Sequence, residues 1–363
     1  IGHGAPPPGV TPPYYVYRDE GRTLRVLTPY TPRPFDHTLA NPGGHVVAVT
    51  SRGLHTSSSV NSQQNRLTPD WADTAGRALP AGAFYLYEES AQAWFAPTFE
   101  PLRDATARHT VDFSADGTAV FHMEKDGLAT ELTVFVPPDQ PAGVYRLVVR
   151  NRSDRPRVLR CAPYFQLALA DQPEHAEGLR LQRTPEQDLV WFENPRNTFR
   201  SGPAFAAVWP AGAAVCTDRE HFFGAGRPVE RPQWVEQPGA SAPPPAARPG
   251  APVAAFLINL AIPPGGERTV VVVLGQADTH PAALRARDAL CSEAGAQQAL
   301  DTTRAWWRRL LSTVQVRSSD HAFDQLLPWL AYQALAERLW ARRGFYQASG
   351  AFGFRDQLQD AVN

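Results

Sequence analysis

The residue types best suited to chemistry lie together near the C-terminal end of the sequence, between Trp340 and Asp360. Glycines in this stretch let the backbone turn tightly and let a ligand approach closely. Aromatic faces suit the apolar faces of a sugar ring, and Arg, Asp and Gln side chains suit its hydroxyl groups. The glycines are Gly344, Gly350 and Gly353, and the aromatic residues are Trp340, Phe345, Tyr346, Phe352 and Phe354.

A polar cluster follows directly and comprises Arg355, Asp356, Gln357, Gln359 and Asp360. If a helix begins at Arg355, then Asp356 and Asp360 lie one turn apart on the same face. The cluster then indicates either the rim of a carbohydrate pocket or a loop that leads into a capped surface helix with an ion pair. Residue types alone leave both interpretations open.

Length and composition limit the class of protein. The sequence has 363 residues, which is enough for two sizeable hydrophobic cores, and its formal net charge of −1 argues against nucleic-acid or anionic-membrane partners. No stretch approaches the roughly 20 apolar residues of a membrane span. The three cysteines are isolated, so we expect no disulfide framework and no zinc site, and a reducing compartment is favoured.

No metal, nucleotide or hydrolase motif is apparent in the sequence. The ten histidines show no metal-ligand spacing. We interpret His109 and His122 as ordinary strand residues and His321 as an exposed helix residue. The sequence therefore predicts no bound metal and no cofactor.

The first 13 residues are rich in Gly and Pro and are interpreted as a tail or linker. Residues 14–280 contain many short β-rich runs, which predict an antiparallel β-sandwich with no helices between its strands. Asp116-Gly117 and Asp126-Gly127 are hairpin-turn signals. The runs 144–151 and 158–169 are predicted to pair, because the short turn 152–156 joins them.

The composition changes at Pro281, after which Ala, Leu, Arg, Gln and Glu predominate. Residues 281–315 are predicted to form a linker of two helices that are split near Gly295, with Trp306 and Trp307 packed against the sandwich. Another helix is predicted to begin with Ser319 as its N-cap and to be kinked or restarted at Pro328. Its apolar positions recur at helical spacing and are Phe323, Leu326, Leu327, Leu330, Ala334 and Leu335.

One further stretch stays ambiguous. Residues 61–73 are polar and do not alternate, so they form either a long functional loop or a plain connection.

A resemblance goes further than the residue types. The runs Phe323–Gln333, Arg338–Arg342 and Gly344–Asp360 strongly resemble the glycoside hydrolase family 94 phosphorylases, which are cellobiose phosphorylase-like enzymes. The likeness is greatest to the phosphorylase-like C-terminal region of cyclic β-1,2-glucan synthases. It extends over nearly the whole chain, although the family usually has Trp where Asp70 stands here, with the tryptophan instead at Trp71.

The resemblance implies a mainly β fold in which a large antiparallel, galactose-mutarotase-like supersandwich is followed by a helical linker and an (α/α)6 barrel. The barrel would begin within residues 316–363. In the family's Arg-Asp-x-x-Gln-Asp motif, Arg355 and Asp360 would bind sugar hydroxyls. Asp356, Gln359 and Phe354 would support them in the substrate-binding subsite.

The family's general-acid aspartate lies well beyond this motif. We therefore expect the catalytic acid and the phosphate pocket beyond Asn363, in a longer parent protein, and expect these 363 residues alone to be inactive. Their arginine neighbour should keep Asp356 and Asp360 ionised, and an ionised carboxylate cannot donate the required proton.

The implied activity is inverting phosphorolysis of β-linked glucosides, with inorganic phosphate as co-substrate and a sugar 1-phosphate as product. Two alternatives remain. The chain is part of a cyclic β-1,2-glucan synthase whose phosphorylase-like region trims chain length, or it is a non-catalytic glucan-binding module. The expected partners are a β-glucan oligosaccharide, phosphate and a second copy in a homodimer. A synthase would add a membrane glycosyltransferase region. The expected location is the cytoplasm, or the cytoplasmic face of the inner membrane for a synthase.

Overall fold

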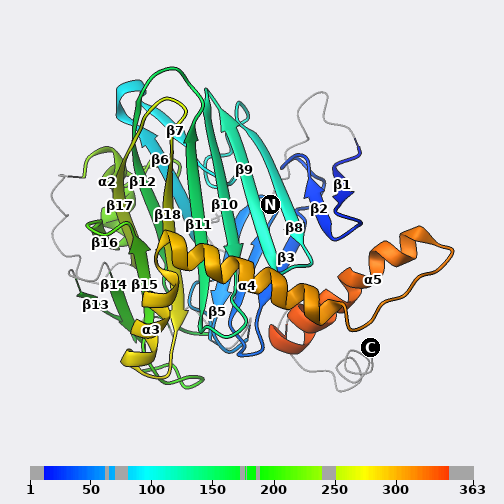
Figure 1. The fold of residues 1–363 in the computed structure, drawn as a ribbon. Helices are drawn as coiled ribbons and strands as arrows, with labels where there is room; N and C mark the ends of the chain where they lie inside the picture. The colour runs from blue at the N-terminus through cyan, green and yellow to red at the C-terminus, as the bar shows by residue number, and fades with distance from the viewer. Residues whose placement is uncertain are drawn as a thin grey trace.

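The structure is a computed structural model and describes residues 12–61, 65–69, 81–171, 176, 178–184, 189–238 and 251–342. Strands dominate the described chain as far as Gln276, and helices follow from His280 onwards (Figure 1). This is the mainly β architecture that the sequence predicts, with strands giving way to helices just before Pro281. The domain ranges 1–13, 14–280, 281–315 and 316–363 remain predictions.

The largest sheet in the described chain has ten strands in the order β1-β2-β8-β9-β10-β11-β18-β15-β14-β13, and every neighbouring pair is antiparallel. Gly117 lies in the turn between β8 and β9, and Gly127 lies in the turn between β9 and β10. Both glycines have positive φ and both strand pairs are antiparallel, which confirms the two predicted hairpins. The strands are β1 (Tyr15–Arg18), β2 (Thr23–Val26), β8 (Arg108–Ser114), β9 (Thr118–Lys125), β10 (Leu128–Phe135), β11 (Ala142–Asn151), β13 (Arg180–Thr184), β14 (Leu189–Glu193), β15 (Ala204–Trp209) and β18 (Glu267–Gln276).

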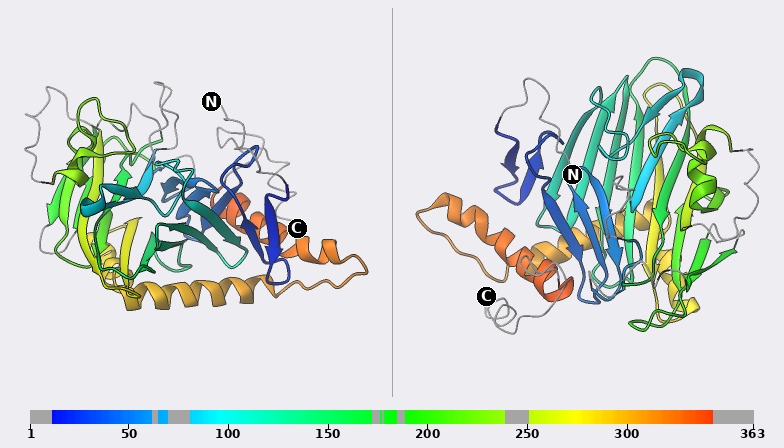
Figure 2. Two further views of the ribbon diagram at one scale, coloured as in Figure 1. Left: turned by 90° about the horizontal axis from the view of Figure 1, so that it is seen from above. Right: turned by 180° about the vertical axis from the view of Figure 1, so that it is seen from behind.

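Two smaller sheets lie across one face of the ten-stranded sheet (Figure 2). One has five strands in the order β16-β17-β12-β6-β7, and the other has three in the order β3-β4-β5. The strands are β3 (Asp36–Ala40), β4 (Val46–Thr50), β5 (Gly53–Ser58), β6 (Gly82–Glu88), β7 (Ala93–Phe95), β12 (Arg157–Gln166), β16 (Ala214–Asp218) and β17 (Pro252–Ile262).

The predicted pairing of residues 144–151 with 158–169 is wrong. Strand β11 pairs with β10 and β18, whereas β12 pairs with β17 and β6 in the other sheet. The turn after Asn151 therefore connects the ten-stranded sheet to the five-stranded sheet. The side-chain amide of Asn151 donates to the backbone oxygens of Arg155, Ile262 and Pro263. A short turn joins consecutive strands in either arrangement, so its length does not identify the partner strand.

Apolar side chains fill three layers. The main core lies between the ten-stranded sheet and the two smaller sheets, and includes Phe84, Leu147 and Val272. A second cluster lies between the outer face of the ten-stranded sheet and the helices α3 (His280–Leu290) and α4 (Glu293–Leu311). A third lies between the outer face of the five-stranded sheet and two short helices, α1 (Arg219–Phe223) and α2 (Gln233–Glu236).

Those two short helices correct the prediction that no helix lies between the strands. They exist because the five-stranded sheet has an aromatic outer face that must be shielded from water. Tyr85 and Tyr164 lie on that face, and Phe222 of α1 packs against both, with ring centroids 5.8 and 4.8 Å apart.

Helix boundaries differ from the sequence prediction at three points. The break between α3 and α4 falls at Cys291 and Ser292, because Ser292 caps α4 by accepting from the Gly295 amide at 3.0 Å, so Gly295 lies within the helix. Asp320, not Ser319, caps α5 (His321–Gln333), and α5 runs through Pro328 without a restart. A π-helix, η4 (Ala334–Trp340), continues directly from α5.

Candidate active-site segment

The residues predicted to bind sugar, Phe354, Arg355, Asp356, Gln359 and Asp360, lie outside the described residues. Their roles stay predictions. The structure does describe the segment that leads into them, which is the π-helix η4 followed by Ala341 and Arg342. It also describes how this segment is held against the sandwich.

An aromatic junction, formed by His37, Trp307, Trp329, Tyr332 and Trp340, joins the C-terminal helices to the sandwich. Trp307 lies at its centre with 1% of its surface exposed, and its ring centroid is 4.4 Å from that of Tyr332 and 5.2 Å from that of Trp340. This confirms the predicted packing of Trp307 against the sandwich. Its neighbour Trp306 is only half-buried and contacts Trp340 at 5.6 Å.

The turn between β8 and β9 is shaped to receive Trp307. Gly117 there has a φ of +80°, and a Cβ atom at this position would lie 2.2 Å from the Trp307 ring. Only glycine combines this backbone conformation with such a close approach. The Asp-Gly signal in the sequence therefore marks both a hairpin and the contact site of the helix.

Two hydrogen bonds fix the junction to backbone oxygens of the sandwich. The indole N–H of Trp329 donates to the backbone oxygen of Gly21 at 2.6 Å, and the Tyr332 hydroxyl donates to that of Thr38 at 2.8 Å. Burial raises the pKa of the Tyr332 hydroxyl well above its usual value, so it stays protonated and remains a donor.

His37 also belongs to this junction and was not predicted from the sequence. Its imidazole stacks on Tyr332 at 5.1 Å with an interplanar angle of 22° and also contacts Trp329 and Phe113. Burial lowers the pKa of His37 to about 4, so the ring is neutral near pH 7. No local sequence signal could reveal this, because the contacts come from segments about 80 and 300 residues away in the chain.

The π-helix η4 is the last regular element that the structure describes, and the predicted sugar-binding motif follows it in the sequence. Its wider turn is closed by the amide of Ala341, which donates to the oxygen of Ala336 five residues earlier at 2.9 Å. Such turns are rare and occur frequently at functional sites. Arg342, two residues after η4, has a φ of +52°, so the described chain ends in a left-handed conformation.

The polar stretch 61–73 is described only in part. Asn65 is buried, and its side-chain amide donates to Gln276 Oε1 at 2.6 Å and to Ser59 Oγ at 2.5 Å. The side-chain amide of Asn197 donates to Asn65 Oδ1, and Arg200 donates to the oxygen of Ser59 at 2.7 Å. This network anchors the start of the stretch to strand β18. Asp70, Trp71 and Asp73 lie outside the described residues.

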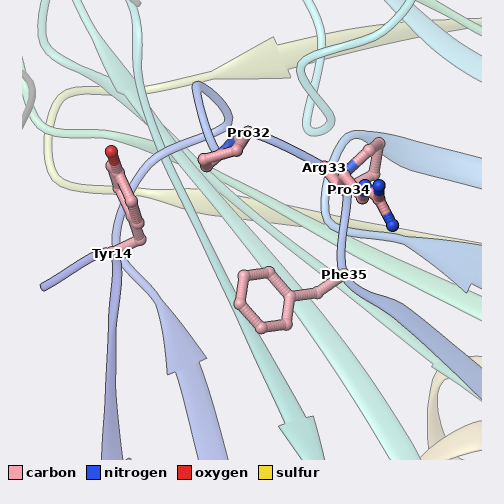
Figure 3. Close-up of a pocket in the computed structure, with 5 residues that line it drawn as sticks. All are labelled: Tyr14, Pro32, Arg33, Pro34 and Phe35. Carbon is pink, nitrogen blue, oxygen red and sulfur yellow. The ribbon is translucent and has the colours of Figure 1, made fainter. Parts of the chain in front are cut away.

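A cleft of about 320 Å³ lies at the N-terminal edge of the sandwich and was not identified from the sequence. It is lined by Tyr14, Pro32, Arg33, Pro34 and Phe35. Figure 3 shows the rings of Tyr14 and Phe35 on either side of an open space, with Arg33 on the side away from Tyr14. The many aromatic residues and prolines in the stretches 14–17 and 29–35 are the sequence feature that could have indicated this cleft.

The histidines and cysteines of the sandwich show no metal-binding arrangement in the described part of the chain. Among the described residues, no three His, Cys, Asp or Glu side chains are arranged to hold a metal ion. His109 lies buried in β8, and the His122 ring in β9 is 3.3 Å from the carboxylate of Asp112. Cys161 and Cys216 are buried free thiols, and burial raises the pKa of Cys216 to about 12. None of the described helices is long and apolar enough to cross a membrane.

Among the curated proteins that match the chain, two illustrate the likeness over almost its whole length. The chain is 32% identical over 350 residues to cyclic β-(1,2)-glucan synthase NdvB of Rhizobium meliloti (strain 1021), a match that covers 92% of this chain and 12% of that protein. It is 21% identical over 375 residues to N,N'-diacetylchitobiose phosphorylase of Vibrio proteolyticus, covering 96% of this chain and 44% of that protein. The chain thus spans less than half the length of each.

Comparison with solved structures supports the fold. A bacterial glucoamylase solved in complex with acarbose superimposes with a TM-score of 0.52 at 9% identity, over 83% of this chain and 39% of that one. At this identity the likeness concerns the fold alone.

Family models identify both parts of the chain. Residues 22–293 match the supersandwich domain of glycosyl hydrolase 94, and residues 306–363 match the catalytic domain of the glycosyl hydrolase 94 superfamily. The first match agrees with the three antiparallel sheets, and the second begins at Trp306, beside the aromatic junction. Both confirm the resemblance read from the sequence: the chain belongs to the glycosyl hydrolase 94 family.

Proposed function

We propose that this chain is part of an inverting glycoside phosphorylase that cleaves β-linked glucosides with inorganic phosphate and releases a sugar 1-phosphate. The observation that carries the proposal is the order of the two family matches, the supersandwich domain and then the catalytic domain, with the Arg355–Asp360 motif inside the second. Phosphorylases among the matched proteins support the same reaction class. In this proposal phosphate is the co-substrate and no metal or other cofactor is needed.

The proposed reaction is a single displacement. A carboxylic acid donates a proton to the glycosidic oxygen while a phosphate oxygen attacks the anomeric carbon from the opposite face, so a β-glucoside gives an α-sugar 1-phosphate. Inverting hydrolases separate two carboxyl groups by about 6.5–9.5 Å to admit a water. Phosphate is already anionic, so it needs no carboxylate base in that space.

In this mechanism Arg355 and Asp360 hold hydroxyl groups of the transferred sugar, and Asp356, Gln359 and Phe354 support them. The aromatic junction contributes indirectly. It fixes the helices that precede the motif to the sandwich through Trp307 and Tyr332. Such anchoring matters because catalysis requires the reacting groups to be held in one geometry.

A second candidate is supported by a separate observation. The match to a cyclic β-(1,2)-glucan synthase covers 92% of this chain at 32% identity. In that case the chain is the phosphorylase-like part that trims the length of a glucan, on the cytoplasmic face of the inner membrane and alongside a membrane glycosyltransferase region. As a free phosphorylase it would act in the cytoplasm as a homodimer.

The test uses the complete reading frame that contains residues 1–363. The purified protein is incubated with linear β-1,2-, β-1,3- and β-1,4-linked glucan oligosaccharides, with and without inorganic phosphate, and sugar 1-phosphate is measured. The proposal expects release that requires phosphate. A shift in the length of a cyclic product without sugar 1-phosphate favours the synthase, and glucan binding with neither product favours a non-catalytic module.

The same assay tests the motif. Arg355→Ala and Asp360→Ala should each lower kcat/KM by about 10- to 150-fold, because removing a charged hydrogen-bond partner from a buried ligand group costs about 1.5–3 kcal/mol. Matched controls are Arg309→Ala and Asp301→Ala, since both residues are exposed on α4. If the motif variants keep the kinetics of the controls on every substrate, the sugar-binding assignment is wrong and the surface-helix interpretation stands.

A further inference from the structure

The N-terminal edge of the ten-stranded sheet carries exposed aromatic rings that the core does not use. Tyr15 and Tyr17 are 41% and 48% exposed, although large aromatic residues usually bury most of their surface. They are two positions apart on β1, so both side chains point to the same face of the strand. The edge position is visible in Figure 1, where β1 and β2 stand at one end of the sheet.

These rings form a row with Phe35. The centroid of Tyr15 is 5.9 Å from that of Tyr17 and 5.4 Å from that of Phe35, both in edge-to-face contact. We call Tyr17, Tyr15 and Phe35 the aromatic row. It runs directly into the cleft described above, because Phe35 belongs to both. Edge-to-face contacts hold the rings in place, so a ligand need not order them on binding.

The chemistry of the row and the cleft suits a chain of sugar units. Ring and proline faces offer flat apolar surfaces for pyranose faces, and tyrosine hydroxyls can exchange hydrogen bonds with sugar hydroxyls. The lining includes no carboxylate, and none of the ion pairs of the described chain involves Arg33, which leaves its guanidinium available as a donor. Successive rings and an open cleft fit an extended chain better than an enclosed small molecule.

Three of these tyrosines lie ahead of the part of the chain that the family model matches. The supersandwich match begins at residue 22, so Tyr14, Tyr15 and Tyr17 precede the part of the chain shared with the family model. Strand β1 has only four residues, and Asp19 and Glu20 after it adopt positive φ. Such a short and sharply ended edge strand is poorly suited to pairing with another strand.

We propose that the aromatic row and the Tyr14–Phe35 cleft form an accessory binding site for a long β-glucan chain. The site holds the polymer by stacking while its end is processed elsewhere. This inference takes its ligand class from the proposed function and adds a second binding surface to it. It predicts that long glucans bind more tightly than disaccharides and that the preference depends on Tyr14, Tyr15 and Tyr17.

The test is affinity electrophoresis of the full chain in gels that contain a soluble β-glucan of many units. The triple variant Tyr14→Ala, Tyr15→Ala, Tyr17→Ala should bind about tenfold more weakly than the wild type, a change of about 1.4 kcal/mol. The triple Tyr→Phe variant keeps the rings and should retain most of the affinity. Phe199→Ala is the matched control, because Phe199 is also 40% exposed but lies in the loop between β14 and β15.

Circular dichroism confirms that each variant is folded. Equal retardation of the wild type, the alanine triple variant and the control overturns the site. So does a change of oligomeric state in the triple variant without loss of glucan binding, because the rings then contact a second copy. Phosphorolysis of a disaccharide should be unchanged in the triple variant. If the protein shows no phosphorolysis but its glucan binding still depends on the tyrosine rings, the proposed function is wrong and the accessory binding site stands.

Discussion

The sandwich and the helix α5 differ in how completely their apolar residues are buried. In the sandwich, strands such as β11 and β18 are buried on both faces. One face of each strand lies within the main core, and the opposite face lies beneath α3 and α4. In α5 the described residues cover one side: Trp329 and Tyr332 are buried, whereas Phe323, Leu326 and Leu330 are 44%, 47% and 47% exposed. The sandwich is therefore a self-contained core, and α5 depends on the aromatic junction for its position.

The largest expected effect comes from removing the centre of that junction. Trp307→Ala should lower the free energy of unfolding by about 3–5 kcal/mol, because a fully buried indole leaves a cavity among Tyr332, Trp340 and Gly117. Chemical denaturation measures the change. Trp306→Ala is the matched control and should cost clearly less, since that ring is half-buried. Equal losses for the two variants would show that the junction does not centre on Trp307.

Acidification should weaken the same junction through His37. Its pKa is lowered by burial from 6.5 to about 4, so the unfolded chain binds the proton more readily than the folded one. The stabilisation is complete above about pH 6.5 and is lost as the pH falls towards 4. Between pH 7 and pH 5 this one group should remove about 2 kcal/mol of the unfolding free energy.

His37→Phe isolates that contribution, because phenylalanine keeps an aromatic ring beside Tyr332 but cannot be protonated. The buried His45 and His109, whose pKa values burial lowers to about 3 and about 4, still titrate in the variant and account for the remaining pH dependence. The difference between the variant and the wild type is measured by urea unfolding at both pH values. His321→Asn serves as the exposed control. An unchanged pH dependence in His37→Phe would mean that His37 is solvated in solution.

A smaller effect should follow from removing one hydrogen bond of the junction. Tyr332→Phe keeps the ring but leaves the backbone oxygen of Thr38 without its 2.8 Å donor, which should cost about 1 kcal/mol. Amide hydrogen exchange in η4 should accelerate, while exchange in β10 and β11 stays the same. Tyr17→Phe removes an exposed hydroxyl as a control, and it should change neither stability nor exchange. Faster exchange throughout the sandwich would show that the two regions unfold as one unit.

Sequence patterns predicted the features that local chemistry decides. Gly117, Asp126 and Gly127 adopt positive φ in the two predicted hairpin turns, and the strands end just before Pro281, where the composition changes. The partner of β11 could not be predicted, because strands buried on both faces carry similar apolar runs and a short turn permits either sheet. The role of His37 depends on neighbours distant in sequence, so no local pattern contains it.

For the candidate site, the sequence contributes more than the described structure. The motif Arg355–Asp360 was found through a family resemblance that the family models confirm, yet the placement of its side chains lies outside the described residues. Physical reasoning from residue types alone left a pocket and a surface helix equally open. What the structure adds is the anchoring of η4, whose π-turn and left-handed Arg342 have no recognisable sequence signature.

The smallest change in stability is expected on the exposed side of α5. Leu326→Gln should alter the free energy of unfolding by no more than about 0.5 kcal/mol, because the side chain is already 47% exposed. Exposed apolar patches promote association, so the variant should instead be less self-associated in sedimentation velocity experiments at high protein concentration. Trp329→Gln on the buried side is the control and should destabilise the protein without this gain, since it loses the 2.6 Å bond to Gly21. If Leu326→Gln destabilises the protein as much as Trp329→Gln does, then residues outside the described chain cover both sides of α5, and the contrast with the sandwich disappears.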